Sequence, residues 1–257
     1  MRRLIGIALF AGGCTLSPWF GSGSSAPTRS DGGDGGNGGD SGDGGSSLEH
    51  GLIGLWHFDE ASGAAIAKDA LMMADGTPSG GVTFGGAGKF GSAATFDGTG
   101  KVTIPGMLGG PKTITLSAWV RLQGPMKDAV ILNLFSVGML AGDPTSVGSR
   151  GYWVDSGNTT RYSPCQSDVS VGSWHHIAFA FEEQNQQMYV DGIAQISTGN
   201  DGAIDYTRGS TAVIGSAQGA SFDLHATSFI GDIDEVAVWN RLLSAAEVSQ
   251  LQTAPVR

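Results

Sequence analysis

The sequence predicts an all-β protein in which two antiparallel sheets pack as a sandwich and one short helix closes the chain. Several segments alternate apolar and polar residues with the period of two that a half-buried strand requires. An Asp-Gly pair separates two strand-like segments, as in a tight hairpin. A helix-capping sequence follows the last strand-like segment. These three kinds of evidence lie at 113–122, 174–181, 191–192, 233–240 and 244–247.

The segment Thr113–Leu122 is predicted to be a strand of one sheet, because its apolar residues recur at every second position. Those residues should pack between the two sheets. They are Ile114, Leu116, Ala118, Val120 and Leu122. Val130–Val137 is nearly continuous in apolar residues and is predicted to be a further central strand.

Trp174–Phe181 alternates in the same way and leads to a predicted hairpin. Ile177, Phe179 and Phe181 face one side of this strand. The pair Asp191-Gly192 suits a two-residue type I′ turn, in which both central residues need a positive φ.

The last predicted strand, Ile233–Asn240, places Asp234, Val236 and Val238 on one face and Glu235 on the other, with Ala237 and Trp239. The following Ser244-Ala-Ala-Glu247 is a capping box, which predicts a short helix to about Leu251.

Taken together, these segments resemble the laminin-G-like jelly-roll family, within the wider concanavalin A-like lectin and glucanase fold. The resemblance covers Leu52 to Leu251 and implies a jelly-roll sandwich domain over 48–257. The matching motifs, in the family's order, are Leu55-Trp-His-Phe-Asp59-Glu60, Gly88-Lys-Phe-Gly91 through Phe96-Asp97-Gly98, Thr113–Val120, Trp174-His-His through Asp191-Gly192, and Gly231-Asp-Ile-Asp234 through Ser244.

The resemblance also bears on the aromatic residues. Trp119 lies among small and polar residues, where it could stack on a sugar ring or pack under a loop. The family motif has a tryptophan here irrespective of ligand, which favours packing. Trp56, Trp174 and Trp239 are also motif positions and are expected in the core. Tyr152 and Trp153, beside glycine and loop residues, are the aromatics most free to contact a ligand, although packing is equally open.

The N-terminal residues 1–20 have the pattern of an export signal. Met1-Arg2-Arg3 precedes a short apolar run that is too short to span a bilayer but suits a signal peptide. The run ends at Ala11-Gly12-Gly13-Cys14, which resembles a bacterial lipoprotein cleavage box with Cys14 as the lipidated residue. Ordinary secretory cleavage near Ala26 is the alternative. The expected location is the outer membrane or cell surface, or otherwise the exterior as a secreted protein.

Residues 21–47 are predicted to be a disordered linker, because eleven glycines and four aspartates there offer almost no apolar area to bury. Such a spacer suits a domain that is tethered to a membrane by a lipid anchor. On either processing route Cys165 has no disulfide partner within the mature chain. It is then expected to be buried or to form a disulfide between molecules.

Charge and motifs exclude some functions. The formal net charge is −10 and no basic stripe occurs, so nucleic acid is not an expected partner. The Glu-x-Asp-x-(x)-Glu strand of laminarinase-type glucanases is missing, and Asp232-Ile-Asp234-Glu235 does not replace it. His175 and His176 are adjacent on a strand and cannot chelate one ion together. Catalysis is therefore not expected.

Calcium is the expected cofactor, because family members hold a structural calcium near their first and last strands. Asp234 matches the aspartate that opens the last strand in that pattern, and Asp59, in the first-strand motif, could approach it if those strands are neighbours. The alternative is that both carboxylates make only turn and backbone hydrogen bonds. Loop aspartates offer a second type of site without convincing spacing: Asp143, Asp155, Asp168, Asp201, Asp205 and Asp223.

Three functions remain open at this level. The first is a non-catalytic surface module that binds glycan or extracellular protein through rim loops. The second is a degenerate or unusual glycoside hydrolase. The third is a structural envelope protein without a small ligand. The first depends on fold analogy.

Overall fold

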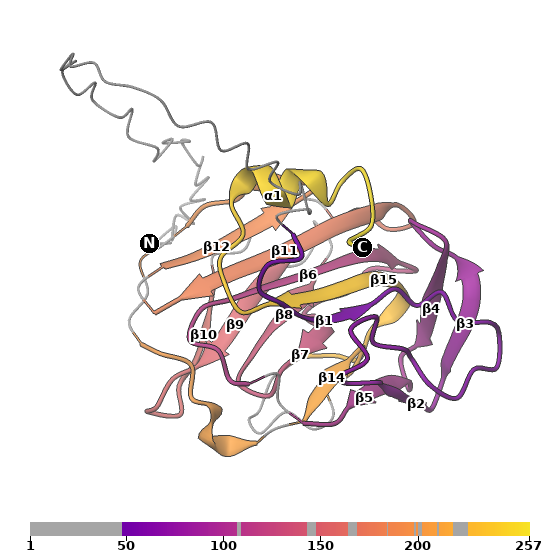
Figure 1. The fold of residues 1–257 in the computed structure, drawn as a ribbon, viewed down its shortest axis with the longest axis horizontal. Coiled ribbons are helices and arrows are strands. Elements are labelled where there is room, and N and C mark those ends of the chain that lie inside the picture. Colours follow the sequence, from indigo (N-terminus) through magenta and orange to yellow (C-terminus); the bar gives the residue numbers. More distant parts are fainter. Residues whose placement is uncertain are drawn as a thin grey trace, which may run out of the picture. The chain divides into compact units, whose positions relative to one another are not determined.

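Two antiparallel sheets lie face to face in the computed structural model (Figure 1). The structure describes residues 48–106, 109–142, 148–163, 169–183, 185–197, 199, 202–209, 211–217 and 226–257. The predicted signal, Cys14, the linker and Cys165 lie outside these residues. The all-β sandwich with a short C-terminal helix is confirmed.

Among the described residues, the first sheet contains eight strands in the order β13-β12-β11-β6-β15-β4-β3, with β1 also paired to β15. Their bounds are β1 Leu52–Trp56, β3 Val82–Ala87, β4 Ser92–Asp97, β6 Ile114–Leu122, β11 Trp174–Glu182, β12 Asn185–Val190, β13 Ile193–Ala194 and β15 Ile230–Trp239. The second sheet has the order β10-β9-β8-β7-β14-β5-β2. Its strands are β2 Thr77–Ser79, β5 Lys101–Ile104, β7 Ala129–Asn133, β8 Val137–Ala141, β9 Arg150–Val154, β10 Thr160–Tyr162 and β14 Ala212–Ile214.

The main core lies between the sheets, and the predicted inner faces of β6 and β11 form part of it. Every apolar residue predicted for the inner face of β6 is buried, as are Ile177, Phe179 and Phe181 of β11. The sequence predicts these inner faces correctly because one face of each strand packs in the core between the sheets and the other does not.

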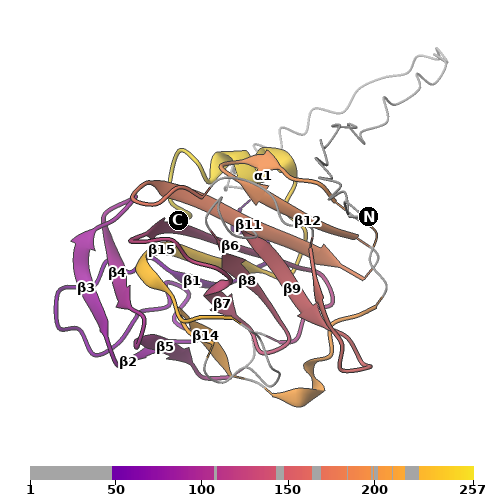
Figure 2. The same ribbon diagram turned by 180° about the vertical axis from the view of Figure 1, so that it is seen from behind.

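A second, smaller core covers part of the outer face of the first sheet. The helix α1, Ala245–Gln250, lies against β11 and β12 there, as both views show (Figures 1 and 2). Ser244 and Glu247 form the predicted capping box. The Asp191-Gly192 turn also has the predicted conformation, with φ values of 49° and 75°.

The predicted single strand Val130–Val137 is wrong. It is a hairpin, because β7 ends at Asn133 and β8 begins at Val137. Phe135 turns the chain with a φ of 70°, and its N–H donates to Asn133 Oδ1. Both strands are buried along their whole length, so the sequence shows no alternation of apolar and polar residues here. The turn between them therefore has no signal in the hydrophobic pattern.

Candidate functional site

One row of side chains crosses four strands on the outer face of the first sheet, at the end of β6. Arg121 in β6 is paired with Trp174 in β11 on one side and with Asp232 in β15 on the other. Asp232 is paired in turn with Thr95 in β4. Side chains at directly paired positions project from the same face of a sheet. We call Thr95, Arg121, Trp174 and Asp232 the rim row.

The rim row is held together by close polar contacts. Arg121 Nε donates to Asp232 Oδ2 at 2.9 Å, and Thr95 Oγ1 donates to Asp232 Oδ1 at 2.6 Å. The Arg121 guanidinium carbon lies 4.8 Å from the centre of the Trp174 ring, within cation–π range. Asp232 is buried, whereas Arg121 is about one-third exposed. The row is therefore a fixed polar surface with one edge open to solvent.

An open hollow of about 450 Å³ lies beside the rim row. Its lining comes from the end of β6, the start of β15 and the segment before β11. Pockets of 300 to 1,000 Å³ are typical for small-molecule and cofactor sites, so the volume is adequate for a sugar unit. We call this space the rim hollow; it is lined by Arg121, Leu122, Gln123, Val171, Gly172 and Asp232.

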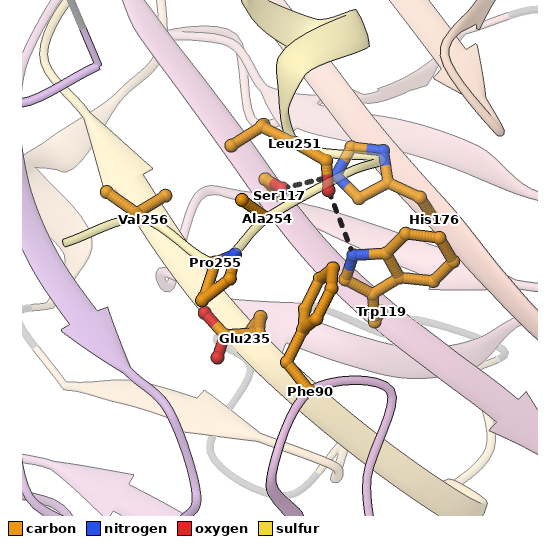
Figure 3. Close-up of a pocket in the computed structure, with 9 residues that line it drawn as sticks. All are labelled: Phe90, Ser117, Trp119, His176, Glu235, Leu251, Ala254, Pro255 and Val256. Atoms are coloured by element: carbon orange, nitrogen blue, oxygen red, sulfur yellow. Dashed lines mark hydrogen bonds between the residues drawn. The ribbon is translucent and has the colours of Figure 1, made fainter. Parts of the chain in front are cut away.

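The next row inward on the same face is covered. Trp119, paired with His176 and Asp234, lies under the segment after α1. Its Nε1 donates to the Leu251 carbonyl at 3.3 Å, and Phe90 packs edge-on against its ring (Figure 3). The remaining hollow is about 10 Å³, room for one water molecule. Packing of Trp119, rather than stacking on a ligand, is therefore what the structure shows.

His176 is fully buried beneath this cover. Its Nε2 lies 2.7 Å from Ser117 Oγ, as Figure 3 shows, and burial lowers the pKa of the imidazole to about 3. The ring is neutral at physiological pH, as a buried histidine without a charged partner should be. His175 points the other way, and its Nδ1 lies 2.8 Å from Asp191 Oδ2 in the hairpin turn.

Asp59 and Asp234 do converge, on one loop. Asp234 Oδ2 accepts from the N–H groups of Lys89 and Phe90, at 2.7 and 3.0 Å. Asp59 Oδ1 accepts from the Ser92 N–H at 2.7 Å. Gly91 has a φ of 59°, and a β-carbon there would collide with the Asp59 carboxylate. The loop 88–92 thus fits closely around both carboxylates. Its hydrogen bonds link Asp59, which follows β1, to Asp234 in β15.

A β-bulge in β15 overturns the predicted alternation of this strand. The register shifts between Asp234 and Ala237, and Glu235 takes a φ of 51°. As a result Val236 lies in the main core, whereas Asp234 lies outside it. Both oxygens of the Glu235 carboxylate lie 3.0 Å from His57 Nδ1. The bulge therefore brings Asp234 and Glu235 close enough to interact electrostatically, contrary to the prediction that they occupy opposite faces.

We call His57, Asp59, Asp234 and Glu235 the carboxylate cluster. Burial, with a smaller contribution from the Glu235 charge, raises the pKa of Asp234 to about 7, although the two loop N–H groups oppose the rise. Burial also raises the pKa of Glu235. The hydrogen bond to Glu235 raises the pKa of His57. Asp234 and Glu235 therefore resist ionisation as long as only the protein surrounds them.

The cluster fits a cation in part. Asp234 Oδ1 is buried without a hydrogen-bond partner, which is the kind of atom that Ca²⁺ would satisfy. However, no three His, Cys, Asp or Glu side chains among the described residues come together as a metal-binding group. Any such ion would need additional ligands from other oxygen atoms.

The loop aspartates that the structure describes do not pair. Asp155 accepts from the N–H groups of Gly157 and Thr159 and forms an ion pair with Arg161. Asp205 caps a short 3-10 helix, Tyr206–Arg208. Asp143, Asp168, Asp201 and Asp223 lie outside the described residues.

Of the two alternatives left open for Tyr152 and Trp153, packing is the one that the structure shows. Both lie within β9 and are buried. Tyr152 donates its hydroxyl to Asn133 Oδ1 at 2.8 Å on the outer face of the second sheet. Trp153 points into the main core and packs against Phe179 and Phe181.

Trp174, which was expected in the core, is instead half-buried at the rim. Trp56 and Trp239 are fully buried as predicted. The rim row itself was not predicted. The alternation in β6 and β15 places Arg121 and Asp232 on outer faces, but only the register between these distant strands brings them together.

Comparison with known proteins supports the fold. A family model for the concanavalin A-like lectin/glucanases superfamily, Laminin_G_3, matches residues 96–249. A search of curated proteins finds no match. Among the described residues, no helix has both the length and the apolar character needed to span a membrane.

Solved structures share the fold at low identity. Domain 4 of AbnA, an extracellular GH43 arabinanase from Geobacillus stearothermophilus in complex with arabinotriose, is 18% identical with a TM-score of 0.58, covering 79% of this chain and 98% of that chain. The binding domain of Paraclostridial Mosquitocidal Protein 1 is 13% identical with a TM-score of 0.62, covering 80% and 52%. The binding domain of botulinum neurotoxin DC, in complex with rat synaptotagmin II, is 12% identical with a TM-score of 0.59, covering 80% and 52%. The chain thus spans about half of each toxin binding domain.

Proposed function

Because the chain belongs to the concanavalin A-like lectin/glucanase superfamily, we propose that it is a non-catalytic recognition module that binds a glycan in the rim hollow. The observation that carries this proposal is the contrast between two parts of one sheet face. The Trp119 row is closed to about 10 Å³, whereas the rim hollow beside it offers about 450 Å³. Of these two places on the described part of the face, the rim hollow is the one with room for a ligand.

The lining of the rim hollow suits a sugar. Gln123 supplies an exposed amide that both donates and accepts, and Arg121 supplies further N–H donors. Val171 is 43% exposed and gives an apolar wall. Sugar rings present hydroxyl groups at their edges and apolar C–H groups on their faces, so polar groups beside an apolar wall match them.

Two of the similar structures support different ligand classes. The arabinanase domain, whose whole length this chain matches, is in complex with arabinotriose, a glycan. The botulinum toxin domain, half of which is matched, is in complex with a protein. The full-length match favours glycan over protein for this chain. Glycoside hydrolysis finds no support in the carboxylate cluster, because the loop 88–92 and the His57 ring already engage its carboxylates.

Filling the rim hollow should weaken glycan binding. Val171→Trp adds a bulky side chain at an exposed position and should weaken the affinity for a glycan-array hit about tenfold or more, at least 1.4 kcal/mol. Isothermal titration against the wild type measures the change. Ile193→Trp is the matched control, since Ile193 is 68% exposed on a hairpin that does not line the hollow. Equal affinity of the Val171→Trp variant and the wild type would contradict the proposed location.

We further propose that Asp59 and Asp234 hold a structural Ca²⁺. The buried, unpartnered Asp234 Oδ1 and the raised Asp234 pKa support the proposal, because a cation there would stabilise the ionised carboxylate. A melting temperature that Ca²⁺ does not change after chelation would contradict it. Export and lipid attachment at Cys14 remain predictions from the sequence.

A further inference from the structure

The charges around the rim hollow are balanced. Arg121 and Asp232 are its charged lining residues, and they form an ion pair with a 2.9 Å contact. The Arg121 guanidinium is also covered on one face by Trp174, and its Nη2 donates to the Ala87 carbonyl at 3.4 Å. Leu122, Gln123, Val171 and Gly172 add no charge. The formal charge of the lining is therefore zero.

Among the described residues, Arg121 is the one cation that lines the hollow. Lys89, which follows the β3 strand, does not line the hollow, and its ammonium lies 4.1 Å from the centre of the Trp119 ring in the covered row. The chain as a whole carries a formal net charge of −10. An anionic ligand approaching the hollow would thus meet a neutralised guanidinium within an acidic protein.

Recognition of a carboxylate normally uses an unpaired guanidinium or ammonium group, which gives short charge-assisted hydrogen bonds. Asp232 already occupies Arg121 Nε, so a uronate or sialate would have to compete with a buried carboxylate. A neutral sugar needs only donors and acceptors for hydroxyl groups, which the Gln123 amide and the remaining Arg121 N–H groups supply. The space above Gly172 is open, with no atom within 4 Å of where a β-carbon would lie.

We propose that the rim hollow selects neutral, hydroxyl-rich sugar units and rejects those that carry a carboxylate. Asp232 is the residue that sets this preference, through its ion pair with Arg121. The inference rests on the proposed glycan binding at the same hollow.

The test compares matched neutral and acidic probes on the full chain. A glycan array and titrations would use lactose against 3′-sialyllactose, and xylan-derived oligosaccharides with and without glucuronate. The wild type should bind each neutral probe at least about tenfold more tightly than its acidic counterpart. Asp232→Asn keeps the side-chain volume but removes the charge that balances Arg121, so acidic members should gain affinity. Asp75→Asn is the matched control, since Asp75 pairs with Lys68 outside the hollow.

Salt dependence gives a second measurement that needs no variant. Binding of a neutral sugar by the wild type should change little between low and high NaCl, whereas binding governed by an ion pair with the ligand would weaken. Preference of the wild type for the acidic probes, or strongly salt-dependent binding, would overturn the charge selectivity alone. Failure of every probe to bind would instead contradict the proposed glycan binding, and so remove the basis of this inference.

Discussion

After treatment with a chelator, ionisation of Asp234 should remove roughly 2–3 kcal/mol of unfolding free energy as the pH rises from about 5 to about 8, with roughly 1 kcal/mol of that loss falling above pH 6.5. The cause is Asp234, whose pKa in the folded protein is raised to about 7 by burial. The unfolded carboxylate ionises near pH 4, so between these values the folded state binds the proton more tightly. That contribution to stability is present at low pH and is lost as the pH rises through 7.

Glu235 and His57 act in the same direction, because the pKa of each is also raised in the folded state. His176 acts oppositely. Its pKa is lowered to about 3, so its contribution is present above pH 6.5 and is lost on acidification. The loss above pH 6.5 is therefore assigned to the carboxylate cluster.

Denaturant unfolding of Asp234→Asn isolates the effect. An amide cannot ionise but can still accept from the Lys89 and Phe90 N–H groups, so the variant should lose less stability than the wild type over the same pH range. Saturating Ca²⁺ should restore the stability of the wild type near pH 8 and leave the variant unchanged. Parallel pH profiles for the two proteins would show that Asp234 is not the group responsible.

Deleting residues 253–257 should destabilise the domain by roughly 2–3 kcal/mol, because it exposes apolar surface on the outer face of the first sheet. Val256 is 5% exposed and belongs to the smaller core with Trp239 and Val248. Ala254 and Pro255 cover the hollow beside Trp119 (Figure 3). Urea unfolding of the truncated and full-length proteins measures the loss.

Val256→Ala and Ile193→Ala form a matched pair for this prediction. Val256 is buried and its truncation should cost about 1–2 kcal/mol, whereas Ile193 is mostly exposed and its truncation should cost little. The rim hollow lies outside the deleted segment, so glycan affinity of the folded truncated protein should persist. Unchanged stability after deletion would mean that these residues do not pack on the sheet in solution.

Much of the fold could be predicted because local patterns determine it. The period of two in β6 and β11 follows from one face packing between the sheets, and Asp191-Gly192 and Ser244–Glu247 carry their own turn and cap chemistry. The bulge in β15 carries no such mark. Glu235 adopts a left-handed conformation that usually occurs at glycine, so nothing in the sequence marks the bulge. The predicted alternation after Asp234 is therefore wrong.

The candidate site was harder to predict, because it depends on which outer faces are covered. Alternation identifies an outer face but does not tell whether a helix, a tail or solvent lies beyond it. The sequence therefore left ligand contact and packing both open for Tyr152, which in the structure packs with Val130 and Leu140 on the outer face of the second sheet. The rim row needed the register of β11, β6 and β15, whose residues are far apart in the chain.

The location of the ligand is tested most directly by the backbone amide NMR shifts of the full chain during titration with the tightest neutral oligosaccharide from the array. We predict that the largest changes in chemical shift fall on the amides of Gln123, Val171, Gly172 and Asp232. The amide signals of Tyr152 and Val154 should not move. Shifts concentrated on the outer face of the second sheet, with the amides around the rim hollow unmoved, would contradict binding at the rim hollow.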